Sequence, residues 1–379
     1  MGIYLNPDSS RFEEAVNSDI YIDKTGLLNY TNSVLHTMQK YICISRPRRF
    51  GKSIAANMLA AYYSRGCDAR ELFSQFEIAK SDTFEKHLNQ YNTIFVNMQE
   101  MLSRSKNVQE LVARFQKLII RELKSEYPEV EYFDEDDLTL CMQDVYVQTK
   151  QTFVIIIDEW DCIFREYKTD REAQEKYLDF LRDLLKDKAY IHLAYMTGIL
   201  PIKKYGTHSA LNMFTEYSMT NPREMAEYFG FTEVEVKKLC ERFHRNFEET
   251  RAWYDGYELV TVDGEEKICY SMYSPKSVVD VMLSGVFDNY WNQTETYEAL
   301  KSYIKLNFDG LKDALNEAKA VYENLNATQE EVDNAKDVLE KAINSLEANT
   351  TTPVDNTAKT PVNNGDTTSV KTGDDINML

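Results

Sequence analysis

Short apolar and β-branched runs alternate with helical patterns from the start of the chain to about Phe308. Five of these runs predict strands, at Tyr41–Ser45, Thr93–Met98, Thr152–Ile157, Tyr190–Met196 and Thr215–Met219. The third run is continuously apolar after its threonine, which is typical of a strand buried on both faces of a parallel sheet. Helical spacing separates the runs, at Ser53–Tyr63, Val108–Glu126 and Arg171–Lys186. This alternation predicts a three-layer α/β domain with a mainly parallel sheet.

The pattern changes at about residue 221, where the strand–helix alternation ends. Thr232 is suited to cap a helix, and Glu235 three residues later completes the sequence of a capping box. We therefore predict a sheet domain over residues 1–220 and a small helical lid or winged-helix-like region over 221–308.

A second change comes near Gly310, after which Tyr322 is the only aromatic residue up to Glu347. Apolar residues at a spacing of three and four predict two helices, separated by Asn326-Ala327-Thr328. This predicts a helical hairpin over residues 309–348. The remainder, residues 349–379, is rich in Thr, Asn, Asp, Gly and Pro, and we expect it to be disordered.

Composition narrows the functional classes. The 379 residues carry a net charge of −19, which argues against a protein that coats nucleic acid or anionic membranes with its whole surface. The six cysteines form no CxxC pair, which favours reduced thiols over a disulfide framework or a zinc site. No apolar stretch approaches 18 residues, and the first 17 residues do not resemble a signal peptide. We expect a cytoplasmic protein without a membrane span.

A candidate phosphate-binding loop lies between the first predicted strand and the helix that follows it. The loop fits the pattern GxxxxGK[ST] at its last three positions but has Arg46 in place of the first glycine. The strand-to-helix context places a triphosphate at a helix N-terminus, where free N–H groups and the helix dipole favour anions. The predicted nucleotide-binding residues are Arg46, Arg48, Arg49, Phe50, Gly51, Lys52 and Ser53.

Each of the last three residues has a separate predicted role. Gly51 lets the backbone approach the phosphates, Lys52 reaches the β- and γ-phosphate oxygens, and the Ser53 hydroxyl binds Mg²⁺. We expect ATP and Mg²⁺ as ligands. The alternative is an ordinary strand–turn–helix with solvated arginines.

Two acidic residues follow the most apolar strand, in the form of a Walker B motif. Asp158 is predicted to hold Mg²⁺, and Glu159 to orient and polarise the attacking water. Acids at the carboxyl end of a parallel strand face the ligand crevice of an open α/β sheet. Capping of the next helix is the alternative. Thr197 ends the next strand and is predicted to sense the γ-phosphate, although a Thr-Gly turn is common after strands.

These motifs resemble a bacterial AAA-ATPase-like family whose ATPase domain is often followed by a PD-(D/E)XK nuclease-like domain. The resemblance covers residues 1–308. It rests on segments 21–25, 46–53, 157–161, 197–198, 253–257, 273–275 and 290–291. In that family the missing first glycine is normal. The resemblance also implies that Asp23-Lys24-Thr25 packs near the nucleotide, with a turn and helix cap as the alternative reading.

The C-terminal part departs from that family, because it shows no strands carrying the acids of a nuclease. The helical pair resembles instead the small repeat modules of bacterial surface proteins, in Ala314–Ala318 and Ala327–Val332.

Three functions remain open after this reading. The first is an Mg²⁺-dependent ATPase that turns over slowly and acts as a molecular switch, and Glu159 favours it. The second is a regulatory module that holds nucleotide without turnover. The third is the ATPase part of a nuclease-linked DNA or defence system. We expect self-association or a protein partner, and nucleic acid only by family analogy. Candidates for an arginine finger are Arg223, Arg242, Arg245 and Arg251.

Overall fold

The computed structural model describes residues 2–202, 211–263, 266–290, 312, 314–321, 332 and 334–339. The chain forms two compact units, Met1–Lys301 and Ser302–Leu379. Within the described residues, no helix combines the length and the apolar character that crossing a bilayer requires.

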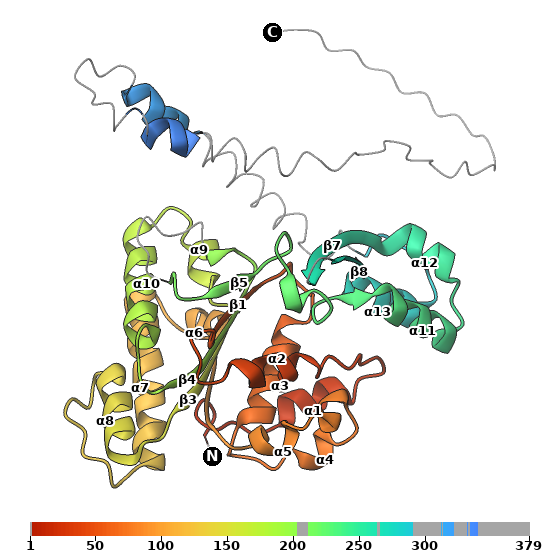
Figure 1. Cartoon of the computed structure of the whole chain (residues 1–379). Coiled ribbons are helices and arrows are strands. Elements are labelled where there is room, and N and C mark those ends of the chain that lie inside the picture. Colours follow the sequence, from red (N-terminus) through yellow and green to blue (C-terminus); the bar gives the residue numbers. More distant parts are fainter. Residues whose placement is uncertain are drawn as a thin grey trace. The chain divides into compact units, whose positions relative to one another are not determined.

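A parallel five-stranded sheet organises the first unit (Figure 1). Its strands are β1 (Tyr41–Ser45), β2 (Asn92–Asn97), β3 (Phe153–Asp158), β4 (Ile191–Gly198) and β5 (Thr215–Tyr217). Their order is β2-β3-β4-β1-β5, and every neighbouring pair is parallel. All five predicted strands are present, with ends that differ by at most two residues. The predicted α/β fold with a parallel sheet is confirmed.

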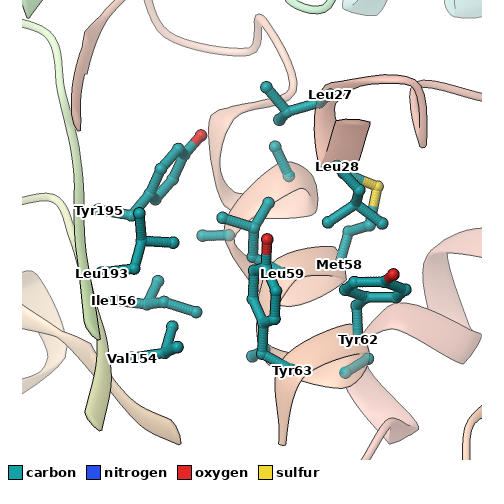
Figure 2. Close-up of a cluster of buried hydrophobic side chains, with 14 of the residues drawn as sticks. Leu27, Leu28, Met58, Leu59, Tyr62, Tyr63, Val154, Ile156, Leu193 and Tyr195 are labelled. Atoms are coloured by element: carbon teal, nitrogen blue, oxygen red, sulfur yellow. The ribbon is translucent and has the colours of Figure 1, made fainter. Parts of the chain in front are cut away.

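One face of the sheet packs against the helix that follows the phosphate loop. Figure 2 shows Leu59 and Tyr63 of α3 (Lys52–Tyr63) near strand residues such as Ile156 and Tyr195. Each of these side chains is fully buried. Truncating Leu59 to alanine would therefore cost about 2–5 kcal/mol. The same layer holds α1 (Ser10–Val16), α2 (Leu27–Val34), α4 (Arg70–Phe73), η1 (Glu77–Lys80) and α5 (Phe84–His87).

The opposite face of the sheet is covered by three longer helices (Figure 1). These are α7 (Val108–Glu126), α8 (Leu138–Thr149) and α10 (Arg171–Leu185). Two short helices, α6 (Met98–Ser103) and α9 (Cys162–Glu166), follow the carboxyl ends of β2 and β3. The central sheet is thus buried on both sides, which explains the continuously apolar sequence of β3.

The rest of the first unit is a small antiparallel sheet with helices. It contains η3 (Arg223–Met225), β6 (Phe231–Thr232), α11 (Glu233–Phe243), α12 (Phe247–Tyr254), β7 (Asp255–Asp263), β8 (Glu266–Tyr273) and α13 (Pro275–Ser284). The strand order is β6-β8-β7. The predicted capping box of Thr232 and Glu235 is confirmed at the start of α11. The β7–β8 hairpin is a difference from the sequence analysis, which predicted no strands here.

In the second unit, the described helical residues 314–321 and 334–339 fall within the two predicted helices. Ala335, one of the residues at the predicted helical spacing, is buried, and so is Ala314, which is not one of them. Leu315 and Val338, which also follow that spacing, are 41% and 43% exposed. The tail predicted over 349–379 lies outside the described residues.

Candidate functional site

The phosphate loop joins β1 to the N-terminus of α3, as the sequence predicted. Gly51 caps the helix with a φ of 85°, in the left-handed region that favours glycine. A side chain there would meet open space, so the backbone conformation rather than crowding requires the glycine. Lys52 and Ser53, the first residues of α3, line a cavity beyond the loop, and the free N–H groups of a helix N-terminus stabilise an anion.

A cavity of about 1230 Å³ opens in front of this helix terminus. It is lined by six of the predicted nucleotide-binding residues: Arg48, Arg49, Phe50, Gly51, Lys52 and Ser53. Glu159 lines it as well. The structure thus brings the loop and the candidate water-polarising acid to one cavity. Its volume is of the size that holds a small-molecule ligand or cofactor.

Arg46 requires a correction, because it was predicted to bind nucleotide. Its side chain is fully buried and does not line the cavity. The guanidinium donates to the carbonyl oxygens of Tyr217, at 2.6 Å, and Met225, at 3.5 Å. It also lies over the ring of Phe229. Because its φ is not positive, this position needs no glycine. Arg46 anchors the start of the loop to β5 and η3.

Phe50 has a structural role besides lining the cavity. Its ring is buried and makes an edge-to-face contact with Tyr257 of β7, with 5.2 Å between ring centroids. Its carbonyl oxygen accepts a hydrogen bond from Gly230 N at 3.2 Å. The phosphate loop is therefore in direct contact with the small antiparallel sheet region.

Lys52 is almost completely buried at the base of the cavity, and its ammonium donates to Pro47 O at 2.9 Å. Burial lowers the pKa of Lys52, while the nearby carboxylates of Glu159, Asp161 and Asp158 oppose that shift. A buried cation at a helix N-terminus is well placed to bind an anion.

Asp158 ends β3 as a buried carboxylate with hydrogen bonds to both oxygens. Oδ1 accepts from the hydroxyl of Thr197, and Oδ2 accepts from Asn97 Nδ2 at 3.1 Å. Neither Asp158 nor Thr197 lines the cavity, whereas Asn97 does. The Thr197 hydroxyl, which was predicted to sense the γ-phosphate, donates to Asp158, and the residue does not line the cavity. Asn97 was missed, although its position at the end of a strand could have indicated it.

Glu159, unlike Asp158, lines the cavity. Its φ of 57° is in the left-handed region, which costs about 1 kcal/mol or more for a residue with a side chain. This turn directs Glu159 to the cavity while Asp158 stays in the sheet. Burial raises the pKa of Glu159, and the neighbouring charge of Arg165 opposes the rise.

Arg165 of α9 is a cavity residue that the sequence analysis missed. Its Nη2 forms an ion pair with Glu159 Oε2 and donates to Gln99 Oε1 at 3.3 Å. None of the four arginines proposed as fingers lines this cavity. The i, i+6 separation of Glu159 and Arg165 gives no regular helical or strand pairing, so no simple sequence signal identified the contact.

Asp161 and Gly198 hold the carboxyl ends of β3 and β4 together. Asp161 Oδ2 accepts from Ile199 N at 2.9 Å and Leu200 N at 2.8 Å, and the residue is fully buried. A Cβ on Gly198 would lie 2.6 Å from Trp160 Nε1, so only glycine fits between these strands.

One part of the cavity lining, the apolar end, is made by two segments that are distant in sequence. Ile20 and Ile22 precede the sheet, while Phe231 and Val279 belong to the small antiparallel sheet region. Lys24 joins the same two parts, because its ammonium bonds Glu235 Oε1 at 2.6 Å and Glu227 O at 2.6 Å. Burial lowers the pKa of Lys24, and Glu235 opposes that shift. Of the segment Asp23-Lys24-Thr25, Lys24 lines the cavity, whereas Asp23 Oδ1 accepts a hydrogen bond from Thr25 N at 2.8 Å, as in the alternative turn.

Oxygen donors suited to a hard cation lie at the phosphate end. Ser53 is exposed to the cavity, and Asp158 supplies a carboxylate at the end of β3. A hydroxyl and a carboxylate are ligand types that Mg²⁺ accepts together with phosphate oxygens and water. Ser53 is open to the cavity, whereas the Asp158 carboxylate is buried and has both oxygens in hydrogen bonds, so the two residues fit this ion by donor type.

The C-terminal segment of the chain matches a known domain. Residues 291–347 match the FIVAR domain, which confirms the predicted surface-protein module and extends it upstream of residue 309. A relative from Azotobacter chroococcum mcd 1, an uncharacterized protein in the vnfD 5' region, is 24% identical over 291 residues. The match covers 73% of this chain and 51% of that protein, so the chain spans about half the length of this relative.

Solved structures show weaker likeness. The Aeropyrum pernix ORC1 protein in complex with DNA has a TM-score of 0.36 and 11% identity, covering 92% of this chain and 74% of that one. AMPPCP-bound DnaA from Aquifex aeolicus has a TM-score of 0.28 and 10% identity, covering 87% and 90%. The family match is much more informative: residues 10–207, more than half of the chain, match the model described as predicted AAA-ATPase. With its parallel sheet and phosphate loop, this chain belongs to the AAA-ATPase-like family of P-loop nucleotide-binding proteins.

Proposed function

We propose that the first unit binds ATP with Mg²⁺, hydrolyses it slowly and acts as a molecular switch. The observation that carries this proposal is the meeting of Lys52, Ser53 and Glu159 at one cavity in front of a helix N-terminus. Lys52 supplies a cation that can bind phosphate, Ser53 an oxygen ligand for Mg²⁺, and Glu159 a candidate base for the attacking water. The proposed ATPase core covers residues 1–220 and the proposed lid 221–308, whose last residues overlap the FIVAR match at 291–347. The proposed module and tail cover 309–348 and 349–379.

The phosphates would lie on the N-terminus of α3, where Gly51 allows close approach and Lys52 supplies the charge. Arg48 and Arg49 line the same end and are proposed to contact phosphate oxygens. The base would lie at the apolar end between Ile22 and Val279. A polar, cationic end and an apolar end suit the two halves of a nucleoside triphosphate.

When bound, Mg²⁺ would be held by Ser53 and Asp158 with phosphate oxygens and would neutralise charge on the β- and γ-phosphates. Thr197 and Asn97 hold the Asp158 carboxylate in place by hydrogen bonds. Glu159 would accept a proton from the attacking water. We propose that Asp158 and Glu159 thereby have different tasks despite being adjacent.

The switch would operate through the contacts between the loop and the lid. Phe50 touches both Gly230 and Tyr257, and Lys24 bonds Glu235 at the start of α11. A nucleotide that moved the phosphate loop would therefore change the position of β7 and α11. We also propose that this output acts on a protein partner or a second copy, and that the protein works in the cytoplasm.

A calorimetric titration of the full chain with ATP, ADP and GTP, with and without Mg²⁺, tests the proposal. We expect saturable binding of ATP that strengthens with Mg²⁺, together with slow release of phosphate. Binding without phosphate release would favour a regulatory module that holds nucleotide. No binding of any nucleotide at millimolar concentration would refute the assignment.

A further inference from the structure

Glu159, the residue that we propose accepts a proton from the attacking water, forms an ion pair with Arg165. Arg165 Nη2 bonds Glu159 Oε2, and its Nε lies 3.5 Å from Asp161 Oδ1. The Arg165 and Glu159 side chains are only 13% and 22% exposed, so solvent screens the pair weakly. A carboxylate held by a guanidinium is less free to accept a proton from water.

Arg165 also lines the cavity, together with Lys52 and Ser53. The cation that restrains Glu159 is therefore open to the same space as the proposed phosphate site. Lys52 is bound to a loop carbonyl, and Asp161 accepts from two backbone N–H groups of the following strand end. Lys52 and Asp161 thus bond backbone groups, whereas Arg165 forms its ion pair with the candidate base Glu159.

We propose that, when ATP binds, Arg165 breaks its ion pair with Glu159 and binds the terminal phosphate instead. Binding of the triphosphate would thereby free Glu159 to act as the base. This inference rests on the proposed function. ADP lacks the terminal phosphate and would leave the ion pair in place. A phosphate group carries more charge than a carboxylate and accepts two guanidinium hydrogen bonds at once, so it competes effectively for arginine.

The exchange has a chemical consequence for hydrolysis. The water oxygen forms a bond to the γ-phosphorus while the bond from that phosphorus to the β,γ-bridging oxygen breaks. The electron pair leaves with ADP, and the water proton passes to Glu159. Arg165 would meanwhile stabilise negative charge on the transferring phosphoryl group. One side chain would thus restrain the base before ATP arrives and assist the reaction afterwards.

A double-mutant cycle tests the exchange, with dissociation constants for ATP and ADP measured by calorimetry on the full chain. In Glu159→Gln the cost of breaking the ion pair is removed, so ATP should bind about 5-fold more tightly while ADP is unchanged. Arg165→Gln should reduce the preference for ATP over ADP by about 10-fold or more. In the double variant the gain from Glu159→Gln should disappear, and Arg165→Lys should restore part of the preference.

Arg114→Gln is the matched control, because it removes a Glu–Arg ion pair on α7, outside the cavity. It should leave both dissociation constants unchanged. The exchange is wrong if Arg165→Gln weakens the binding of ATP and of ADP equally, and if Glu159→Gln changes ATP affinity by the same factor with and without Arg165. In that case the proposal that the chain binds ATP still stands. If the wild-type chain binds no ATP, the proposed function and this inference both fall. If Arg165→Gln does not fold, Arg165→Lys and Glu159→Gln still decide the question through the ATP-to-ADP ratio.

Discussion

Arg46 Nη1 donates a 2.6 Å hydrogen bond to the carbonyl oxygen of Tyr217, 171 residues further along the chain. This bond ties the first position of the phosphate loop to the edge strand β5. Arg46 N also donates to Gly198 O at 3.1 Å. The residue that departs from the general P-loop pattern is thus the one that holds the loop in the sheet.

Replacing Arg46 by glycine would restore the general motif and yet should weaken the protein. The buried carbonyl groups of Tyr217 and Met225 would lose their donor, with an expected cost of about 3 kcal/mol in the free energy of unfolding. Urea denaturation measures this cost. Unchanged stability with weaker ATP binding would instead return Arg46 to the nucleotide site.

Lys52→Ala should reduce ATP affinity by about 100-fold or more. The change removes the cation at the proposed phosphate end, and among the described residues that line the cavity it is the only buried one. The melting temperature should change little, since the ammonium bonds a loop carbonyl and not the core. Lys168→Ala, at an exposed position outside the cavity, is the control. Wild-type affinity in Lys52→Ala would show that this loop is not the phosphate site.

Glu159→Gln should keep ATP bound but lower the rate of phosphate release by about 100-fold, because the amide cannot accept the water proton. Asp158→Asn should instead weaken binding that depends on Mg²⁺. Single-turnover assays with both variants separate the two effects. Equal turnover in Glu159→Gln and wild type would leave a non-hydrolysing switch as the better assignment.

Thr197→Val tests whether this hydroxyl acts through Asp158 or directly on the nucleotide. The change removes the donor to Asp158 Oδ1 inside the protein, so we expect a loss of about 1–3 kcal/mol in stability and weaker Mg²⁺ dependence. Thr197→Ser should behave like wild type. A selective loss of ATP over ADP binding, with stability unchanged, would support direct contact with the γ-phosphate.

Acid should destabilise the first unit through His192. Burial lowers the pKa of His192 from 6.5 to about 4, and the charges of His36, His87 and Lys40 add to the effect. Its ring also stacks on His36, with 5.2 Å between centroids. Between these two pKa values the unfolded chain binds a proton that the folded chain does not, so stability falls as pH decreases from about 7 toward 4.

Thermal melts from pH 7.5 to pH 5 measure this loss. His192→Gln should reduce the slope of melting temperature against pH and leave the value at pH 7.5 nearly unchanged. An identical slope in the variant would mean that other groups cause the acid sensitivity.

The sequence by itself determined those features that depend on neighbouring residues. The five strands, the helices α3, α7 and α10, and the capping box of Thr232 and Glu235 were predicted, because burial and capping repeat at short, fixed spacings, whereas α8 was not predicted. The strand–loop–helix context also identified the cavity end formed by Gly51, Lys52 and Ser53. The β7–β8 hairpin carried a usable signal as well, since Asp263-Gly264 stands between two runs that suit strands, and it was overlooked.

Only the tertiary structure decided which polar groups meet. Arg46 reaches Tyr217, and Thr197 reaches Asp158, across neighbouring strands that are distant in sequence. Glu159 faces Arg165 because a left-handed turn redirects one side chain of an acidic pair. Hydrogen bonds and ion pairs require atoms within a few ångströms, and the folded path of the backbone sets those distances. The residue types indicated a nucleotide site, whereas the fold assigned each of them its partner.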